Sequence, residues 1–361
     1  MSRRFRVIDA GLRSGRFNIA LDQAMLELHQ EGRIADSLRF IHFQPAALLG
    51  RHQSLSAELD LSYCHAHGIE VGRRITGGGA IYLDPGQLGW ALVFGRRALG
   101  NASLGDTARV LCEAAAAGLS RLGIDARFRP RNDIEVAGRK VSGTGGFYEG
   151  ETLLYQGTVL VELDPASMLG ALRIPRAKVA KRGLDSAAQR VVSLRELLGS
   201  ATPAIEEVER ALLAGFEERL GIEFERAPPS ELETTRAREL YDSQIGQEEF
   251  VAEIDGPPEG AEVSVGTHEG AGGTITSYLR REGPRGRRIG QVLITGDFFI
   301  APPRLVFDLE SRLRGVDVEA MGATIEEFFD AHPAGTLSVT AADFRRSLEA
   351  AVTATPAAAT S

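Results

Sequence analysis

Lysine is rare in this chain, and its three positions single out the side chains best suited to chemistry. Of the 41 basic residues only Lys140, Lys178 and Lys181 are lysine. Arginine replaces lysine poorly where a compact ammonium must act as a point charge or donate from a confined space. Lys140 lies in a glycine-rich setting, so we predict a functional role for it, whereas codon bias explains Lys178 and Lys181 equally well.

Three consecutive glycines form a second candidate feature, within the segment RRITGGGAIYLD at residues 73–84. Because glycine has no side chain, the backbone N–H groups of such a run can approach a bound anion closely. Arg73 and Arg74 would add positive charge for a phosphate or a carboxylate. A flexible hairpin turn explains the glycines alone, but it explains the adjacent arginines less well. We therefore predict an anion-binding loop.

A third segment, RNDIEVAGRKVSGTGG at residues 131–146, carries Lys140. A predicted strand at 132–136 turns at Ala137-Gly138, and Lys140 begins the returning strand. This arrangement predicts one ammonium on a rigid hairpin, next to another glycine-rich stretch. Residues 175–191 are basic at their start and lack apolar periodicity, which fits a loop over an anionic ligand and a solvated charged loop equally well.

Other functional classes find little support in the sequence. No P-loop and no complete GxGxxG motif is present, and Cys64, His65 and His67 would converge poorly on a metal from one short helix. A formal net charge of −8 does not suit a general nucleic-acid binder. Two cysteines exclude a disulfide framework, and we see neither a secretory signal nor about 18 consecutive apolar residues. We expect a cytoplasmic protein that contacts neither nucleic acid nor a membrane.

The pattern of strand and helix signals around these segments predicts an α/β fold of the α+β type. We expect a mixed, largely antiparallel sheet with flanking helices. Strand signals come in close pairs, and the helices between them do not recur regularly enough for a doubly wound parallel sheet. The strands are predicted at 5–9, 37–43, 46–50, 69–71, 80–82, 89–94, 133–136 and 152–163. The helices are predicted at 61–67 and 106–122, with others capped by Asn18 and by Thr202-Pro203.

A change of composition divides the chain. Residues 239–269 contain nine acidic residues and no lysine or arginine, and they include Gly256-Pro257-Pro258. We predict a catalytic domain at 1–245, a linker at 246–261, a small C-terminal β-β-β-α-α-α domain at 262–353 and a disordered tail at 354–361.

Taken together, these segments resemble the A-type lipoate–protein ligases, in their two-domain form with a C-terminal accessory domain, within the biotin and lipoate protein ligase superfamily. The order and spacing of several blocks carry the resemblance. The blocks are RFNIALDQAML (16–26), LLGRHQS (48–54), RRITGGGAIYLD (73–84), RNDIEVAGRKVSG (131–143), YQGTVLVELD (155–164) and KRGLDSAAQRVVSL (181–194), with ITGDFF (294–299) in the accessory domain.

This resemblance implies an enzyme that activates lipoate with ATP and Mg²⁺ to lipoyl-AMP and transfers the lipoyl group to a lysine of a carrier protein or domain. Lys140 would be the catalytic lysine, reaching the carboxylate and the α-phosphate, and Asp133 would lie near Mg²⁺. Lipoate would contact Arg74, Lys140, Gly157 and Thr158. ATP and lipoyl-AMP would contact Arg74, Gly77, Gly78, Gly79, Ala80, Ile81, Tyr82, Asn132, Asp133, Lys140, Lys178, Lys181 and Gly183.

One position departs from the family pattern, and several alternatives stay open. The family commonly has histidine where this chain has Gln156, which can position a group but cannot titrate near neutrality. An octanoyl or lipoyl transferase of the same fold would need a cysteine near the lysine hairpin, and the stretch ARFRPR at 126–131 has none. A biotin–protein ligase and a non-catalytic binding module are the remaining alternatives; octanoate is a possible second substrate.

Overall fold

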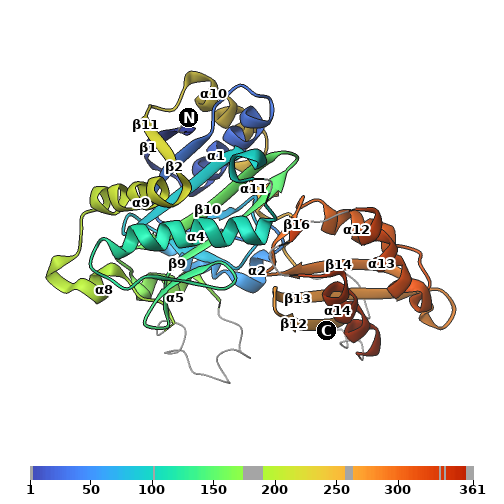
Figure 1. The fold of residues 1–361 in the computed structure, drawn as a ribbon. Coiled ribbons are helices and arrows are strands. Elements are labelled where there is room, and N and C mark those ends of the chain that lie inside the picture. The colour runs from blue at the N-terminus through green and yellow to red at the C-terminus, as the bar shows by residue number, and fades with distance from the viewer. Residues whose placement is uncertain are drawn as a thin grey trace.

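The computed structural model describes residues 3–100, 102–173, 190–256, 263–332, 335–336 and 339–354. Within these ranges the chain forms two adjacent units, one around an eight-stranded sheet and one around a three-stranded sheet (Figure 1). The predicted fold class is confirmed, because the large sheet is mixed and mostly antiparallel and carries helices on both faces. No described helix is long and apolar enough to cross a bilayer.

The large sheet places the lysine hairpin, formed by β8 and β9, toward one edge and the buried strand β6 near its centre. Only the pairs β11–β1 and β1–β2 are parallel. In spatial order the strands are β11 (Ile222–Arg226), β1 (Arg3–Arg13), β2 (Ser37–Phe43), β6 (Gln87–Gly95), β10 (Thr152–Leu160), β9 (Arg139–Glu149), β8 (Asp133–Val136) and β7 (Arg127–Arg129).

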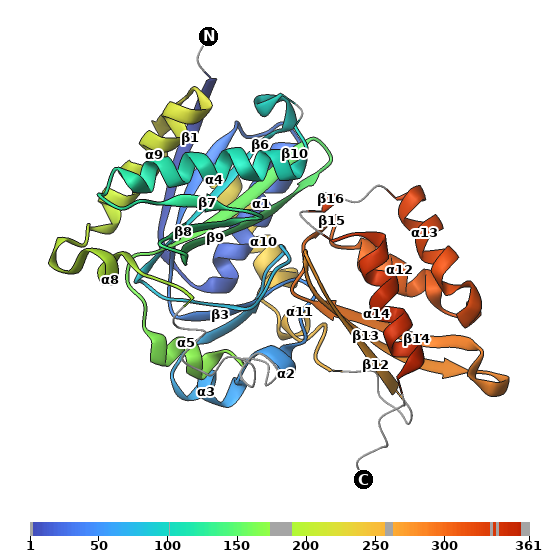
Figure 2. The same cartoon turned by 60° about the horizontal axis from the view of Figure 1, so that its bottom comes forward.

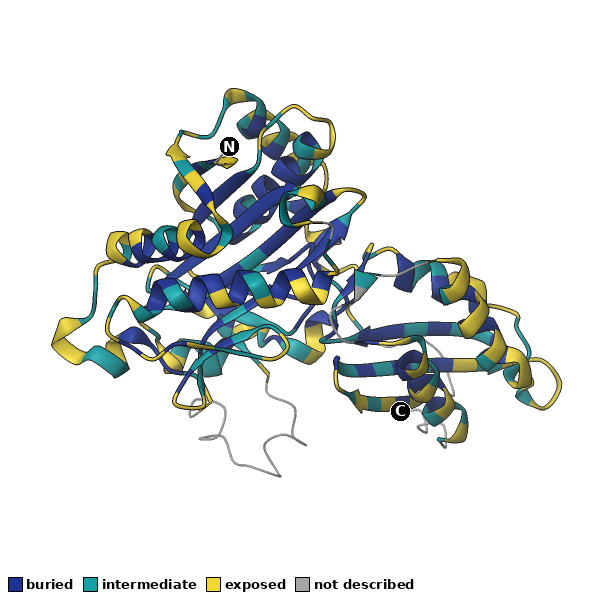
Figure 3. Cartoon of the chain, viewed as in Figure 1, coloured by how far each residue is buried: buried dark blue, intermediate teal, exposed yellow. Residues whose placement is uncertain are grey.

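Two hydrophobic clusters hold helices to the two faces of this sheet. Helices α4 (Leu104–Ser120) and α9 (Ile205–Leu220) cover one face, while α1 (Gly15–Gln30) covers the other and packs against α10 (Glu231–Leu240) (Figures 1 and 2). Successive residues of β6 alternate between the clusters, so the central strand is buried on both sides (Figure 3). This confirms the strand predicted at residues 89–94.

A second, smaller sheet presents the glycine loop. Strand β3 (Ala46–Leu49) lies between β4 (Glu70–Arg73) and β5 (Ile81–Leu83), and residues 74–80 connect the last two. The short helices α2 (Leu55–Glu58), α3 (Leu61–Ala66) and α5 (Pro165–Ala171) lie around it, and α8 (Leu194–Leu198) precedes α9.

The C-terminal unit has its own sheet and its own core. Strands β12 (Val263–Gly270), β13 (Gly273–Glu282) and β14 (Arg288–Gly296) form an antiparallel sheet. Three helices then follow in the predicted order: α12 (Leu305–Leu313), α13 (Met321–Ala331) and α14 (Ala341–Thr353). The short strands β15 (Ile300–Ala301) and β16 (Gly335–Thr336) pair with each other and contact β9 of the first unit.

The predicted linker at 246–261 is partly structured. Helix α11 (Glu248–Val251) lies within it, and Phe250, Val251 and Ile254 are buried. The carbonyls of all three accept hydrogen bonds from Arg73. Residues 257–262 and 355–361 lie outside the described ranges. We therefore propose that the first unit extends to about residue 256, and that residues 263–353 form the accessory domain.

The predicted N-cap of α1 was wrong. Ser14, not Asn18, caps the helix, because its hydroxyl accepts the N–H of Phe17. Asn18 lies one turn inside, where its side chain donates to the His42 carbonyl and accepts from Arg39. The helix thus starts earlier than its apolar pattern indicates.

Candidate active site

A cavity of about 490 Å³ lies between the glycine loop, strands β9 and β10, and the C-terminal unit. This volume falls within the range typical of small-molecule sites. Its polar part includes Lys140, Asp133 and Asn132. Its apolar lining comes largely from α1, β2 and the small sheet: Ile19, Ile41, Phe43, Leu48, Ile81 and Leu83. The cavity can therefore take a molecule with an apolar chain and an anionic end.

Lys140 is held in place through its backbone on both sides. It pairs with Glu135 in β8, while its N–H donates to the Arg190 carbonyl at 2.8 Å and its carbonyl accepts from Val192 at 2.8 Å. Its ammonium lies 2.7 Å from Asp133 Oδ1, and the side chain is 36% exposed. The ammonium is therefore fixed in direction yet accessible from the cavity.

Asp133 lies between two cations. Its Oδ1 contacts Lys140, and its Oδ2 accepts from Arg129 at 2.5 Å. Burial by itself would raise the pKa of Asp133, but the charges and hydrogen bonds of Lys140 and Arg129 outweigh burial and lower this pKa below its ordinary value. Asp133 is therefore a carboxylate at neutral pH.

Arg74 holds the glycine loop in place through hydrogen bonds to its carbonyls. It is buried and donates to the carbonyls of Leu48 at 2.8 Å, Gly77 at 3.1 Å and Gly79 at 2.8 Å. Burial lowers its pKa to about 10, so the guanidinium stays charged at pH 7 and places a positive charge at the cavity wall.

The expectation that both arginines serve a bound anion was wrong for Arg73. Neighbouring residues at the end of a strand point to opposite faces. The Arg73 guanidinium is buried away from the cavity, where it donates to six backbone carbonyls, among them those of Gln53 and Val251. Arg73 is thus a structural residue that holds the segment after α11.

The glycine loop also contacts the C-terminal unit. The N–H of Gly78 donates to the Phe298 carbonyl at 3.0 Å, and a Cβ atom on Gly77 would lie 2.1 Å from that same oxygen. Gly78 has φ +91°, a conformation that favours glycine. In this arrangement at least one loop N–H group is bonded to protein, a use that the triple glycine did not reveal.

Gln156 faces the cavity and is held by a buried ion pair. Its side-chain amide donates to Asp22 Oδ2, and Asp22 pairs with Arg39 at 2.5 Å in a completely buried contact. Burial raises the pKa of Asp22, although Arg39 and Gln156 favour its charged form. Gln156 is therefore a fixed polar group at the cavity wall.

The structure brings most of the predicted site residues to this one cavity. Lys178, Lys181 and Gly183 lie outside the described residues. Gly157 must be glycine, because a Cβ atom there would lie 2.3 Å from the Trp90 ring. The predicted site residues that line the cavity are Arg74, Gly77, Gly78, Gly79, Ala80, Ile81, Tyr82, Asn132, Asp133, Lys140, Gly157 and Thr158.

The comparison with known families agrees with this geometry. The model of the lipoyl protein ligase A/B catalytic domain matches residues 14–217. The chain belongs to this family. The match covers the glycine loop, the lysine hairpin and Gln156, all of which contribute to the cavity wall.

Relatives in this family carry out two different reactions. The chain is 31% identical to lipoate-protein ligase A subunit 1 of Thermoplasma acidophilum, over 65% of this chain and 91% of the relative. It is 30% identical to octanoyltransferase LipM of Kyrpidia tusciae, over 68% and 97%. Family membership alone therefore leaves the reaction open between a ligase and a transferase.

Two solved structures of lipoate protein ligases match most of this chain. A lipoate-protein ligase A with bound ATP has a TM-score of 0.61 and 28% identity, covering 70% of this chain and all of that one. The bi-partite lipoate protein ligase of Thermoplasma acidophilum, studied with its E2 lipoyl domain, has a TM-score of 0.61 and 27% identity, covering 72% and 99%.

Neither cysteine of this lipoyl ligase family member lies in the cavity wall. Cys112 is fully buried in α4, where its sulfur contacts Thr144 Oγ1 at 3.2 Å and the Tyr155 hydroxyl at 3.5 Å. Cys64 is buried below the small sheet. Burial raises the pKa of both thiols, which disfavours the thiolate that a nucleophile requires.

Within the described ranges, one group of side chains could hold a metal ion, and this group lies outside the cavity. Asp9, His42 and Glu209 bring one ligand atom each within 4.8 Å of the others. Arg226 also contacts Glu209, at 3.7 Å, so this group is already an ion network. Cys64, His65 and His67 form no such group among the described residues.

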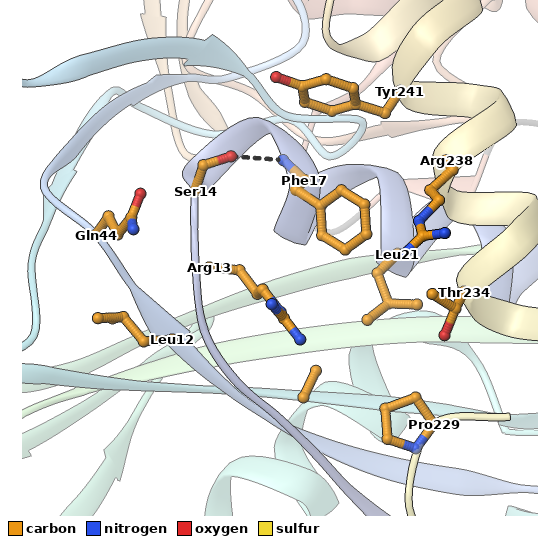
Figure 4. Close-up of a pocket in the computed structure, with 11 residues that line it drawn as sticks. Leu12, Arg13, Ser14, Phe17, Leu21, Gln44, Pro229, Thr234, Arg238 and Tyr241 are labelled. Atoms are coloured by element: carbon orange, nitrogen blue, oxygen red, sulfur yellow. Dashed lines mark hydrogen bonds between the residues drawn. The ribbon is translucent and has the colours of Figure 1, made fainter. Parts of the chain in front are cut away.

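A second cavity, of about 420 Å³, lies between the start of α1 and α10 (Figure 4). Its wall includes Leu12, Arg13, Phe17, Arg238 and Tyr241, and it contains neither a carboxylate nor a thiol. It shares no lining residue with the first cavity, so we place no catalytic group in it.

Sequence reasoning missed two contributors to the site. Phe299 lines the cavity from the C-terminal unit, although its segment had been recognised only as a family block. Asp22 supports Gln156 from α1. A carboxylate within the apolar pattern of a helix was the available signal for Asp22, because such a residue is rarely buried without a partner.

Proposed function

We propose that this chain is an ATP-dependent lipoate–protein ligase. It activates lipoate to lipoyl-AMP and then transfers the lipoyl group to a lysine of a lipoyl carrier protein or domain. The observation that carries the proposal is the position of the chain's only two cysteines, which are both buried outside the cavity, whereas Lys140 lines it.

A transferase without ATP would form an acyl thioester on the enzyme, so its thiol must reach the acyl group. Cys112 lies on the opposite face of β9 from the cavity, behind Thr144 and Tyr155. Activation by ATP needs no such thiol. It needs positive charge where two anions meet, and Lys140 offers that charge.

In the first step a lipoate oxygen attacks the α-phosphorus of ATP, and pyrophosphate leaves. The ammonium of Lys140 lowers the repulsion between the carboxylate and the phosphate, with Arg74 as a second positive charge. Ile41, Phe43 and Leu48 bury the apolar lipoyl chain. In the second step the acceptor amine attacks the acyl carbonyl, AMP leaves, and an amide forms.

Asp133 is the residue that would hold Mg²⁺. It supplies the hard oxygen ligand that this ion prefers, but Lys140 and Arg129 already bind its two oxygens. A single carboxylate suits an ion bound mainly by ATP phosphates and water, provided that one of these contacts is exchanged. When bound, the ion would neutralise charge on the phosphates.

An octanoyltransferase is the second candidate, because LipM octanoyltransferases match this chain with identity similar to that of the ligases. The ATP-bound ligase structure and the ligase studied with an E2 lipoyl domain support the first candidate and its carrier partner. We further propose a cytoplasmic location, where ATP is available and both cysteines stay reduced.

The two candidates predict different outcomes for one experiment. Lipoate-dependent exchange of pyrophosphate into ATP is measured for the parent chain, for Lys140→Ala and for the double variant Cys64→Ala/Cys112→Ala. The ligase predicts exchange in the parent, a loss of at least about 100-fold in Lys140→Ala, and activity within about threefold in the double variant.

Lys140→Ala is a fair test because Arg129 continues to pair with Asp133, so that the carboxylate is not left uncompensated. Its thermal midpoint serves as the folding control. The proposal is rejected if the parent shows no exchange while octanoyl groups pass from a carrier thioester without ATP and Cys112→Ala abolishes that transfer.

A further inference from the structure

The segment between β14 and β15 places two aromatic rings on opposite sides of the junction between the units. Phe298 is completely buried, stacks on the His52 ring at 5.2 Å and packs edge-on against Phe344. Phe299 is only partly buried and lines the active-site cavity. One ring thus anchors the segment, and the other faces the site.

The Phe299 ring lies against two glycines of the first unit. A Cβ atom on Gly145 would lie 2.3 Å from its Cε1 and 2.5 Å from its Cζ, and a Cβ atom on Gly78 would lie 2.6 Å from Cζ. Any side chain at either glycine would collide with the ring. The ring therefore closes the gap between the glycine loop and β9.

This ring is close to the catalytic ammonium. Gly143 and Gly145 are alternate residues of β9, so both face the cavity, about 6.6 Å apart along the strand. A Cβ atom on Gly143 would lie 2.5 Å from Lys140 Nζ. The ammonium thus lies over one glycine and the ring over the next glycine on the same face of β9.

Backbone hydrogen bonds on both sides fix the position of this ring. The Gly78 N–H donates to the Phe298 carbonyl, and the Gly296 N–H donates to the His52 carbonyl, each at 3.0 Å. At the edge of the junction Arg51 lies 5.0 Å from the centre of the Phe307 ring, and Phe307 does not line the cavity. Phe307 is therefore a matched control for contact between the units.

We propose that the ring of Phe299, which the C-terminal unit contributes to the active site of the first unit, keeps water away from the acyl-adenylate. The inference rests on the ligase function proposed above. In the reaction that it suppresses, a water oxygen attacks the acyl carbonyl, the bond to AMP breaks, and lipoate, AMP and a proton are released. An apolar ring over the anhydride leaves no path for that water from this side.

The test uses the full chain with lipoate and ATP and without any acceptor. Under these conditions AMP is released only when lipoyl-AMP is hydrolysed or escapes and then hydrolyses. Phe299→Ala is expected to raise the rate of AMP release about tenfold relative to the rate of pyrophosphate–ATP exchange measured on the same samples. Phe299→Leu, which restores apolar bulk, is expected to return AMP release most of the way to the parental rate.

Phe307→Ala separates shielding from loosened contact between the units, and it is expected to release AMP at the parental rate. The inference is overturned if Phe299→Ala leaves AMP release unchanged, or if Phe307→Ala raises it equally. Faster exchange in Phe299→Ala, with unchanged AMP release, would also overturn it, because the ring would then obstruct the site. A parent chain without any exchange would overturn the ligase function itself.

Discussion

Replacing Gly143 by alanine should remove most of the activity without unfolding the protein. A Cβ atom at this position would lie 2.5 Å from Nζ and 2.6 Å from Cε of Lys140. Gly143 has an ordinary strand conformation and pairs with Thr158 in β10, so the backbone can accept alanine. The lysine side chain, rather than the strand, must then move.

The size of that movement follows from van der Waals distances. Non-bonded carbon and nitrogen atoms approach to about 3.5 Å, so Nζ must withdraw by about 1 Å. This displacement breaks the 2.7 Å contact with Asp133 and moves the ammonium from the place where carboxylate and phosphate meet. A misplacement of about 1 Å costs on the order of 100-fold in rate.

Stability should change little. Losing one half-exposed ion pair costs less than about 1 kcal/mol. Replacing a strand glycine by alanine offsets this by about 0.4–1 kcal/mol through the unfolded chain. The thermal midpoint should therefore stay within about 2 °C of the parent.

The assay is lipoate-dependent pyrophosphate–ATP exchange, with the thermal midpoint measured on the same samples. Gly105→Ala in α4 is the matched control, because its Cβ atom would meet no atom closer than 4.0 Å. The reasoning is refuted if Gly143→Ala keeps exchange within about threefold of the parent, or if lost activity comes with a lowered midpoint.

Three further predictions concern ionisable groups that are buried or partly buried. Burial raises the pKa of Glu310 to about 7, so the stability that its protonation contributes is complete below pH 4.5 and is lost as pH rises through 7. Glu310→Gln should remove this pH dependence of stability in thermal unfolding, and it should raise the free energy of unfolding by at most about 3 kcal/mol at pH 8. An unchanged pH dependence would contradict the prediction. Asp22→Asn leaves the buried Arg39 without its carboxylate and should cost about 3–5 kcal/mol in urea unfolding, whereas a loss below about 1 kcal/mol would show the pair to be dispensable. Contact with Glu209 raises the pKa of His42, so that this pair stabilises the fold below pH 6.5 and ceases to do so as pH rises through the higher folded value. His42→Gln should flatten the stability slope between pH 6 and 8, and a parallel slope in both proteins would count against the pair.

The lysine hairpin could be read from the sequence because its signals are local. Strand patterns on both sides of Ala137-Gly138 predict the turn, and the returning strand then brings Lys140 back to Asp133. The fold class followed in the same way, since paired strands with irregular helices favour antiparallel neighbours.

The sequence could have predicted that Arg73 and Arg74 have different roles. Consecutive residues of a strand point to opposite faces, so Arg73 and Arg74 could not both reach one anion. The sequence could not show which of them turns inward, because this depends on the end of α11 and the residues after it, which bind Arg73 from far along the chain.

Sequence patterns alone determined the central strands of the first unit, the lysine hairpin and the glycine loop, because each depends on neighbours a few residues away. The tertiary structure decided which groups meet: Phe299 over Gly145, Asp22 behind Gln156, and Cys112 behind β9. These contacts join segments separated by up to some 150 residues. They depend on how whole units pack against one another, and no local pattern records that packing.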